Sequence, residues 1–198
     1  MNAEEFETYL EQMKVHCGLI ADLTKRLKGI SPQFGKTVLQ KMVFLLQEVY
    51  GVDAGYSFGF HTFGPFAPEL LGDLDIAETY GAVVVKSGEG GYGHGYVIEP
   101  GGQIDACLAD ADAFLRANGH AITTLVSAFG GKTAKELELL TTIVYLNKEI
   151  MFDESKMTRA EAVGKIRELK PKFTDSDVRY GMDELEKKHH VNLMFANG

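Results

Sequence analysis

Residues 36–51, KTVLQKMVFLLQEVYG, form the stretch of this 198-residue chain that most constrains its fold. Apolar residues occupy most of the circumference that a helix would have here, which is typical of a helix buried at the centre of a domain. Ser31 and Pro32 precede it with a hydroxyl and a ring that suit a helix start, and Gly51 follows it. We therefore expect a central, buried helix from about Ser31 to Tyr50.

The second decisive stretch is HTFGPFAPELLGDLDIAETYG, residues 61–81. Two prolines bracket the entry to a helix from about Pro68 to Tyr80. Its leucines recur at the spacing of one dry face, and Gly81 is suited to end it. The run GYSFGFHTFG, residues 55–64, alternates aromatic and small residues and predicts a strand.

The elements around these stretches predict a winged-helix unit. Apolar residues recur every three or four positions from about residue 4 to 28, as on one face of a long amphipathic helix. The runs AVVVKS, residues 82–87, and YVIEP, residues 96–100, have β character and are separated by a glycine-rich segment, which predicts a hairpin. Three helices followed by a hairpin is the order of winged-helix domains, a variant of helix-turn-helix.

Beyond Pro100 the pattern is again helical. Apolar residues define one helix face over residues 104–115, and a second helix is expected after Gly119. Two capping-box patterns, Thr133 with Glu136 and Thr158 with Glu161, each predict a helix start. The helix after Thr158 is expected to direct Val163, Ile166 and Leu169 inward and to end at Pro171, a last helix covers residues 175–189, and VNLMF (191–195) suits a short strand.

The expected fold class is therefore mainly α with a small β-hairpin. We expect a winged-helix-like domain over residues 1–130 and a C-terminal helical unit over residues 131–198, with the boundary at the GGK sequence near residues 130–132. The sequence leaves open whether the helical unit packs on the first domain or stands apart from it.

The composition is that of a folded protein without a membrane span. The longest uninterrupted apolar run, Met42 to Leu46, has five residues, whereas a membrane helix needs about 20. The first residues are acidic and amphipathic, unlike a secretory signal, so we expect a cytoplasmic protein. The two cysteines, Cys17 and Cys107, are then expected to be reduced and buried.

No motif indicates catalysis or a cofactor. The segment FGGKT, residues 129–133, lacks the first glycine of a phosphate-binding loop because Val126 stands there. The six histidines show no metal-ligand spacing, and the glycine-rich hairpin tip lacks the helix that would bind a pyrophosphate. His61 precedes the glycine–proline turn, and we expect it to have a structural role and not a catalytic one. We expect a non-enzymatic protein with no cofactor and no metal.

Charge decides what a winged-helix unit could bind. Residues 61–130 carry only two basic side chains against nine acidic ones. The helix at residues 68–80, in the position of a recognition helix, has four carboxylates and no basic residue, which opposes binding to the phosphates of duplex DNA. Its acidic face is either a surface for a basic protein or simply solvated. A weaker basic cluster, which leaves DNA binding open, comprises Lys165, Arg167, Lys170, Lys172, Lys187 and Lys188.

The two decisive stretches also carry a family resemblance. The chain resembles the SocA-like (Panacea) antitoxin domain and the related YwgA-like proteins over roughly residues 30–100. The matching positions are Leu39, Gln40, Lys41, Phe44 and Leu45 in the first stretch, and Phe63, Gly64, Pro65, Glu69 and Leu70 in the second. The resemblance implies a small cytoplasmic prokaryotic protein that binds and neutralises a toxin or delivers it to a protease.

We therefore expect an antitoxin-like regulatory protein that binds a protein partner, such as a basic toxin, through the acidic helix and the glycine-rich hairpin. The alternative is a DNA-binding transcriptional regulator that acts as a dimer through another surface. Whether the chain forms a homodimer is left open. The candidate partner-binding residues are Gly64, Pro65, Glu69, Asp73, Asp75, Glu78, Tyr92 and His94.

Overall fold

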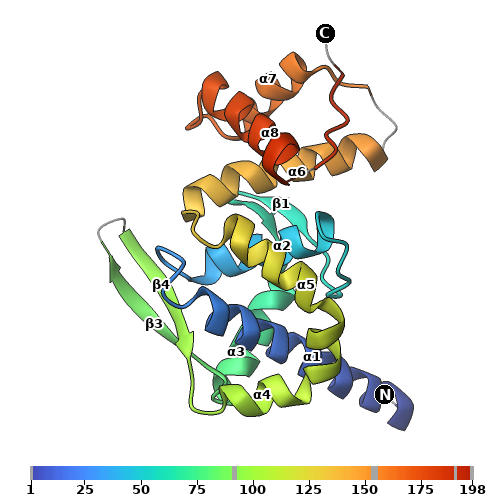
Figure 1. The fold of residues 1–198 in the computed structure, drawn as a ribbon, viewed down its shortest axis with the longest axis vertical. Helices are drawn as coiled ribbons and strands as arrows, with labels where there is room; N and C mark the ends of the chain where they lie inside the picture. The colour runs from blue at the N-terminus through green and yellow to red at the C-terminus, as the bar shows by residue number, and fades with distance from the viewer. Residues whose placement is uncertain (1, 91–92, 153–155, 190, 197–198) are drawn as a thin grey trace. The chain divides into compact units, whose positions relative to one another are not determined.

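A computed structural model describes residues 2–90, 93–152, 156–189 and 191–196 (Figure 1). The elements in chain order are α1 (Ala3–Leu27), α2 (Lys36–Glu48), β1 (Gly59–His61), β2 (Gly64–Phe66), α3 (Pro68–Thr79), β3 (Val83–Gly90), β4 (Gly93–Pro100), α4 (Ile104–Asp110), α5 (Asp112–Phe129), α6 (Ala134–Phe152), α7 (Arg159–Leu169) and α8 (Asp175–His189). The fold is mainly helical with two small antiparallel sheets, which confirms the expected class. None of the described helices combines the length and the apolar character of a membrane span.

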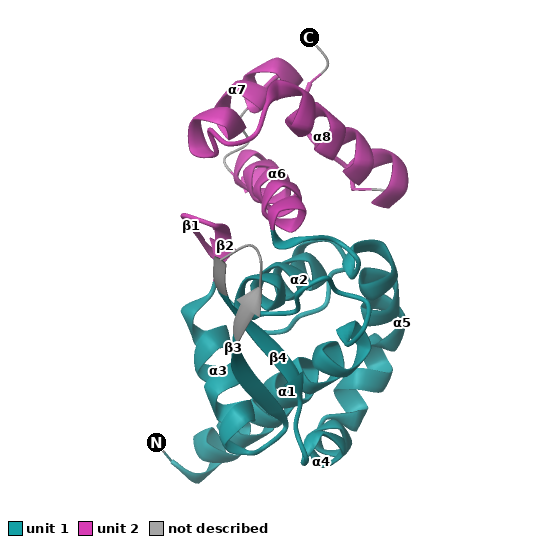
Figure 2. Ribbon diagram, turned by 90° about the vertical axis from the view of Figure 1, so that its left-hand side faces the viewer, with its two compact units in different colours: residues 1–58, 67–134 teal, residues 59–66, 135–198 magenta. Residues whose placement is uncertain are grey.

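The chain divides into two compact units, coloured separately in Figure 2. Unit 1 comprises residues 1–58 and 67–134, and unit 2 comprises residues 59–66 and 135–198. The division near residue 134 lies close to the expected boundary. The short hairpin β1–β2, however, belongs with the C-terminal helices, whereas the sequence pattern placed it in the first domain. Its three-residue strands are too short for the aromatic alternation to indicate which helices they join.

Unit 1 is built on α2. Every residue from Val38 to Leu46 is buried, as expected for a central helix. The helix begins at Lys36 and not near Ser31, because residues 34 and 35 run beside β4. Ile98 N–H donates to the Phe34 carbonyl over 2.8 Å, and a Cβ on Gly35 would lie only 2.0 Å from the carbonyl oxygen of Tyr96.

Two glutamines of α2 hold the chain where it leaves unit 1 and where it returns. The buried amide of Gln40 donates to the Ala67 carbonyl over 2.8 Å and accepts from the Ala67 N–H over 2.9 Å. Gln47 makes the same two-way contact with the backbone of Tyr56, at 3.0 and 3.2 Å. Residues seven apart lie on one face of a helix, so both contacts come from the same side of α2.

The remaining elements of unit 1 follow the sequence pattern with one shift. The helix α3 and the β3–β4 hairpin form as expected, with Val83 opposite Pro100 at the base of the hairpin. The break between α4 and α5 falls at Ala111 and not at Gly119, which lies inside α5. A Cβ on Gly18 of α1 would lie 2.1 Å from the Ala111 Cβ, so close packing against α1 accounts for the position of the break.

Unit 2 consists of α6, α7, α8 and the hairpin β1–β2. The capping box of Thr158 and Glu161 forms at the start of α7, and Val178, Met182 and Leu185 of α8 are fully buried. Leu169, expected to point inward, is 40 % exposed at the last position of α7. Residues 191–195 form no strand, and Ala196 makes an isolated bridge with Thr158.

A buried lysine anchors the hairpin within unit 2. Lys170, with 3 % of its side chain exposed, donates to the Thr62 carbonyl and lies 5.1 Å from the centre of the Phe60 ring. Its Nζ is also 3.0 Å from Glu138 Oε1, an ionic contact between two buried side chains. Because the hairpin's carbonyl and ring both contact this ammonium group, residues 59–66 are tied to the C-terminal helices.

We predict that Gln40→Met destabilises the protein by about 2–3 kcal/mol, because it keeps the side-chain length but leaves the buried Ala67 N–H without its acceptor and the Ala67 carbonyl with only the Leu70 N–H at 3.3 Å. Urea unfolding followed by circular dichroism measures the loss. The control Gln12→Met lies on the exposed half of α1 and should change stability by less than about 0.5 kcal/mol. Equal midpoints for the two variants would contradict the role assigned to Gln40.

Candidate functional site

The acidic helix α3 presents fewer free carboxylates than its sequence indicates. Glu69 and Asp75 are exposed, and neither forms an ion pair among the described residues. Glu78 is also exposed, but its Oε1 accepts the Val85 N–H over 2.7 Å and so joins α3 to β3. The surface of α3 that remains available to a partner is therefore centred on Glu69 and Asp75.

Asp73, expected to contact a partner, instead belongs to a largely buried polar cluster. Its Oδ2 lies 2.7 Å from His16 Nδ1 and accepts the Tyr56 hydroxyl over 2.8 Å. The rings of His16 and Tyr56 stack with their centres 4.4 Å apart. Only 16 % of the Asp73 side chain is exposed, so this carboxylate links α1, α3 and the segment before β1 and is not a surface residue.

A paired aspartate and histidine resemble part of a catalytic triad, but the surroundings oppose that chemistry. Cys17 follows His16 along α1, but adjacent helical residues do not face each other. Burial raises the pKa of the Cys17 thiol to about 12, and Cys107 and Asp73 reinforce the shift. A thiol that stays protonated at neutral pH is not an activated nucleophile. Burial and Asp73 also raise the pKa of Tyr56. The cluster is structural.

Gly64 and Pro65 of the glycine–proline turn, which the sequence analysis expected to bind a partner, are not exposed either. Gly64 and Pro65 are buried in β2 of unit 2, and Gly64 has a φ of 89°, a backbone conformation that favours glycine. They shape the turn and are not exposed to a partner. Tyr92 lies outside the described residues. The backbone of His94 pairs with Glu89 in the β3–β4 hairpin, and its side chain lies outside the described part of the structure.

The basic cluster that left DNA binding open is neutralised within unit 2. Each of its six members lies within ion-pair distance of a carboxylate. The pairs are Lys165–Glu168, Arg167–Asp175, Lys170–Glu138, Lys172–Glu138, Lys187–Asp183 and Lys188–Glu184. Unit 2 carries eleven basic and twelve acidic side chains, so no positive excess is available to attract phosphates.

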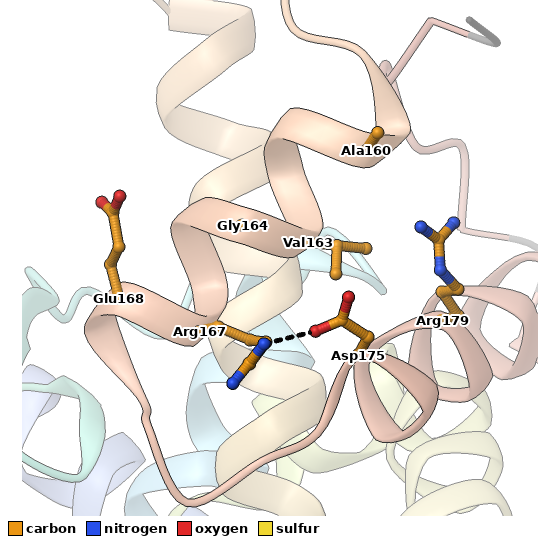
Figure 3. A pocket seen from close by; sticks show the side chains of 7 residues that line it. All are labelled: Ala160, Val163, Gly164, Arg167, Glu168, Asp175 and Arg179. Atoms are coloured by element: carbon orange, nitrogen blue, oxygen red, sulfur yellow. Dashed lines mark hydrogen bonds and ion pairs between the residues drawn. The ribbon is translucent and has the colours of Figure 1, made fainter.

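Unit 2 also contains a surface pocket of about 530 Å³ between α7 and α8 (Figure 3). Five residues of α7 line it at the spacing of one helix face: Ala160, Val163, Gly164, Arg167 and Glu168. Asp175 and Arg179 of α8 complete the lining, and Arg167 Nη1 donates to Asp175 Oδ1 over 2.7 Å. Arg179 lies on the other side of Asp175 and forms no ion pair among the described residues.

No protein-family model matches this chain, and no curated protein matches it. Among the described residues, no group of three His, Cys, Asp or Glu side chains could hold a metal ion. The candidate function therefore rests on the surfaces themselves.

The sequence contained a signal for the buried cluster that the charge argument overlooked. Asp73 follows Leu70 by three residues and precedes Ala77 by four, so it lies on the same inward face as those buried residues. The pattern that identified the dry face of α3 thus also placed one of its carboxylates inside. His16 and Tyr56 carried no comparable signal, because their partner is distant in the sequence.

Asp73→Ala is expected to destabilise the protein by about 2–4 kcal/mol, since it removes the shared acceptor of His16 and Tyr56. Asp75→Ala, two residues away on the exposed side of α3, serves as the matched control and should shift stability by less than about 0.5 kcal/mol. Thermal or urea unfolding of both variants tests this. Similar effects of the two changes would show that Asp73 is an ordinary surface carboxylate.

Alkylation should report the environment of Cys17. Its pKa of about 12, against an ordinary value of 9.0, leaves about a thousandfold less thiolate at pH 8 than a free cysteine has. Iodoacetamide should therefore modify Cys17 at least that much more slowly in the folded chain than in urea, as measured by mass spectrometry. Because the unfolded thiol ionises first, the stability contribution of this group is present below pH 9 and falls as pH rises toward 12. Equal alkylation rates in both states would contradict the assignment.

Proposed function

We propose that this protein is a non-enzymatic, antitoxin-like regulatory protein whose unit 1 is a winged-helix module that binds a basic protein surface. The observation that carries the proposal is the charge of α3. In the position of a recognition helix it has no basic residue, and it exposes Glu69 and Asp75 without cationic partners among the described residues.

The winged-helix assignment is supported by the order of elements and by their packing. Helices α1, α2 and α3 precede the antiparallel hairpin β3–β4, and α3 packs against both α1 and β3. The contact of Ile98 N–H with the Phe34 carbonyl places the segment before α2 along the outer edge of β4. This is the position in which a short additional strand would extend a winged-helix sheet.

Electrostatics favour a protein partner over duplex DNA. Unit 1 carries nine basic and sixteen acidic side chains, a net charge of −7 with histidines neutral. Phosphate binding would bring like charges together, whereas a basic protein surface would neutralise Glu69 and Asp75 on contact. The alternative, a DNA-binding regulator, loses support because all six residues of the basic cluster in unit 2 are paired with carboxylates. The resemblance to SocA-like antitoxins suggests a toxin as the basic partner.

Charge reversal on α3 tests the proposal. The tagged full chain should capture a protein from cells of its source organism at low salt, and Glu69→Lys with Asp75→Lys should reduce that capture at least tenfold. The control Asp105→Lys with Asp110→Lys makes the same change in net charge on α4 and should retain capture. Quantitative mass spectrometry of the captured proteins provides the readout.

A second arm measures binding of the wild-type chain to a labelled random-sequence duplex at low salt. The proposal expects no salt-sensitive binding. It fails if the duplex binds, or if both charge-reversed proteins capture the same partner equally well.

A further inference from the structure

The N-terminal half of α1 is an amphipathic helix whose apolar side has little cover. Burial along α1 begins at His16, and the preceding turns project beyond the other helices of unit 1 (Figures 1 and 2). Phe6 and Tyr9 are 46 % and 49 % exposed, and Leu10 and Met13 beside them are only partly buried. The helix nevertheless starts with a complete capping box between Asn2 and Glu5. This segment is an ordered apolar stripe, which typically marks an interaction site.

Acidic residues flank the stripe. At 100° per residue, Glu5 and Glu7 lie on opposite edges of the face formed by Phe6, Tyr9, Leu10 and Met13. If two copies paired stripe against stripe, these carboxylates would approach one another, and like charges at the edges of a helix pair oppose association. The surface that complements the stripe should therefore have an apolar floor and basic edges.

The pocket between α7 and α8 has such a floor, and the uncompensated charge at its edge is basic. Of the charged residues that line it, Asp175 pairs with Arg167 and Glu168 pairs with Lys165, which leaves Arg179. Its floor consists of Ala160, Val163 and Gly164, and a Cβ placed on Gly164 would meet no atom within 4 Å. Two small residues four positions apart allow another helix to approach α7 closely. Arg179 at the edge carries a charge that no carboxylate neutralises among the described residues (Figure 3). The groove thus offers space for an apolar side chain above Gly164 and one positive charge, on Arg179, that a carboxylate of the docked segment would neutralise.

We propose that the N-terminal half of α1 from one copy of the chain docks into the α7–α8 groove of a second copy. Phe6 or Tyr9 fills the space above Gly164, and a flanking glutamate faces Arg179. The contact joins two different surfaces, so each copy offers one helix and one groove. The inference does not depend on α3 or on the proposed partner.

The docked segment is short, so the interface is small. Interfaces below about 1,200 Å² in total are usually transient, and self-association should therefore depend on protein concentration. Added salt should weaken it because one of its contacts is ionic. Charge reversal at Glu69 and Asp75 should leave it unchanged.

Two full-length variants test each side of the contact by sedimentation velocity over a range of concentrations. Gly164→Leu fills the groove, while the higher helix propensity of leucine favours α7, so the fold is retained. Phe6→Ser with Tyr9→Ser removes the two exposed apolar side chains and leaves the groove intact. Each variant alone should associate at least tenfold more weakly than the wild type.

Mixing the two variants is the decisive experiment. The Gly164→Leu chain still offers its helix, and the Phe6→Ser, Tyr9→Ser chain still offers its groove, so an equimolar mixture should form a complex of one copy of each. Association of Gly164→Leu alone at the wild-type strength, a mixture that stays monomeric, or a wild-type chain that is monomeric at every concentration would each overturn the proposal. Circular dichroism of both variants verifies that they are folded.

Discussion

The two-way amide contacts of Gln40 and Gln47 are the constraint on which the layout of the chain depends. Between them the chain leaves unit 1, forms the hairpin of residues 59–66 in unit 2, and returns to start α3. The glutamines are two helical turns apart, so α2 fixes the ends of this excursion about 10 Å apart along its axis. Ala67 has no side chain with which to cap α3. Its buried N–H would lose its acceptor without Gln40, and its carbonyl would keep only the Leu70 N–H; this explains why a polar side chain occupies the centre of an otherwise apolar helix.

The helix α3, which starts directly after Ala67, shows that burial determines which acidic residues are available to a partner. The sequence of α3 contains four carboxylates and no basic residue, and charge alone does not distinguish among the four. In the structure Asp73 binds His16 and Tyr56, Glu78 binds the backbone of β3, and only Glu69 and Asp75 face outward without such contacts. Two of the four acidic residues thus hold α3 against its neighbours. The exposed acidic surface of α3 is therefore smaller than the sequence predicts, but it is still negatively charged.

Local patterns predicted what depends on local interactions. The periodicity of α2, α3 and α8 and the capping box at Thr158 gave elements close to those observed, because each depends on residues three or four positions apart. The failures involve distant contacts. The start of α2 is set by β4, the break at Ala111 by the close approach of α1, and the hairpin's membership of unit 2 by Lys170, which is 108 residues from Thr62. The burial of Asp73 was missed for the same reason, since its partners lie 57 and 17 residues away.

The two units differ in net charge, and this difference affects which partners each could attract. Unit 2 pairs most of its basic residues internally and has almost no net charge, so shape and single uncompensated groups such as Arg179 dominate what its surface offers a partner. Unit 1 keeps a net charge of −7, which costs free energy through self-repulsion and is offset when a basic surface approaches. An acidic excess concentrated in one unit attracts basic partners from a distance and repels nucleic acid. Under the proposed winged-helix assignment, the helix position that reads DNA in basic proteins would serve protein recognition in this chain without any change of fold.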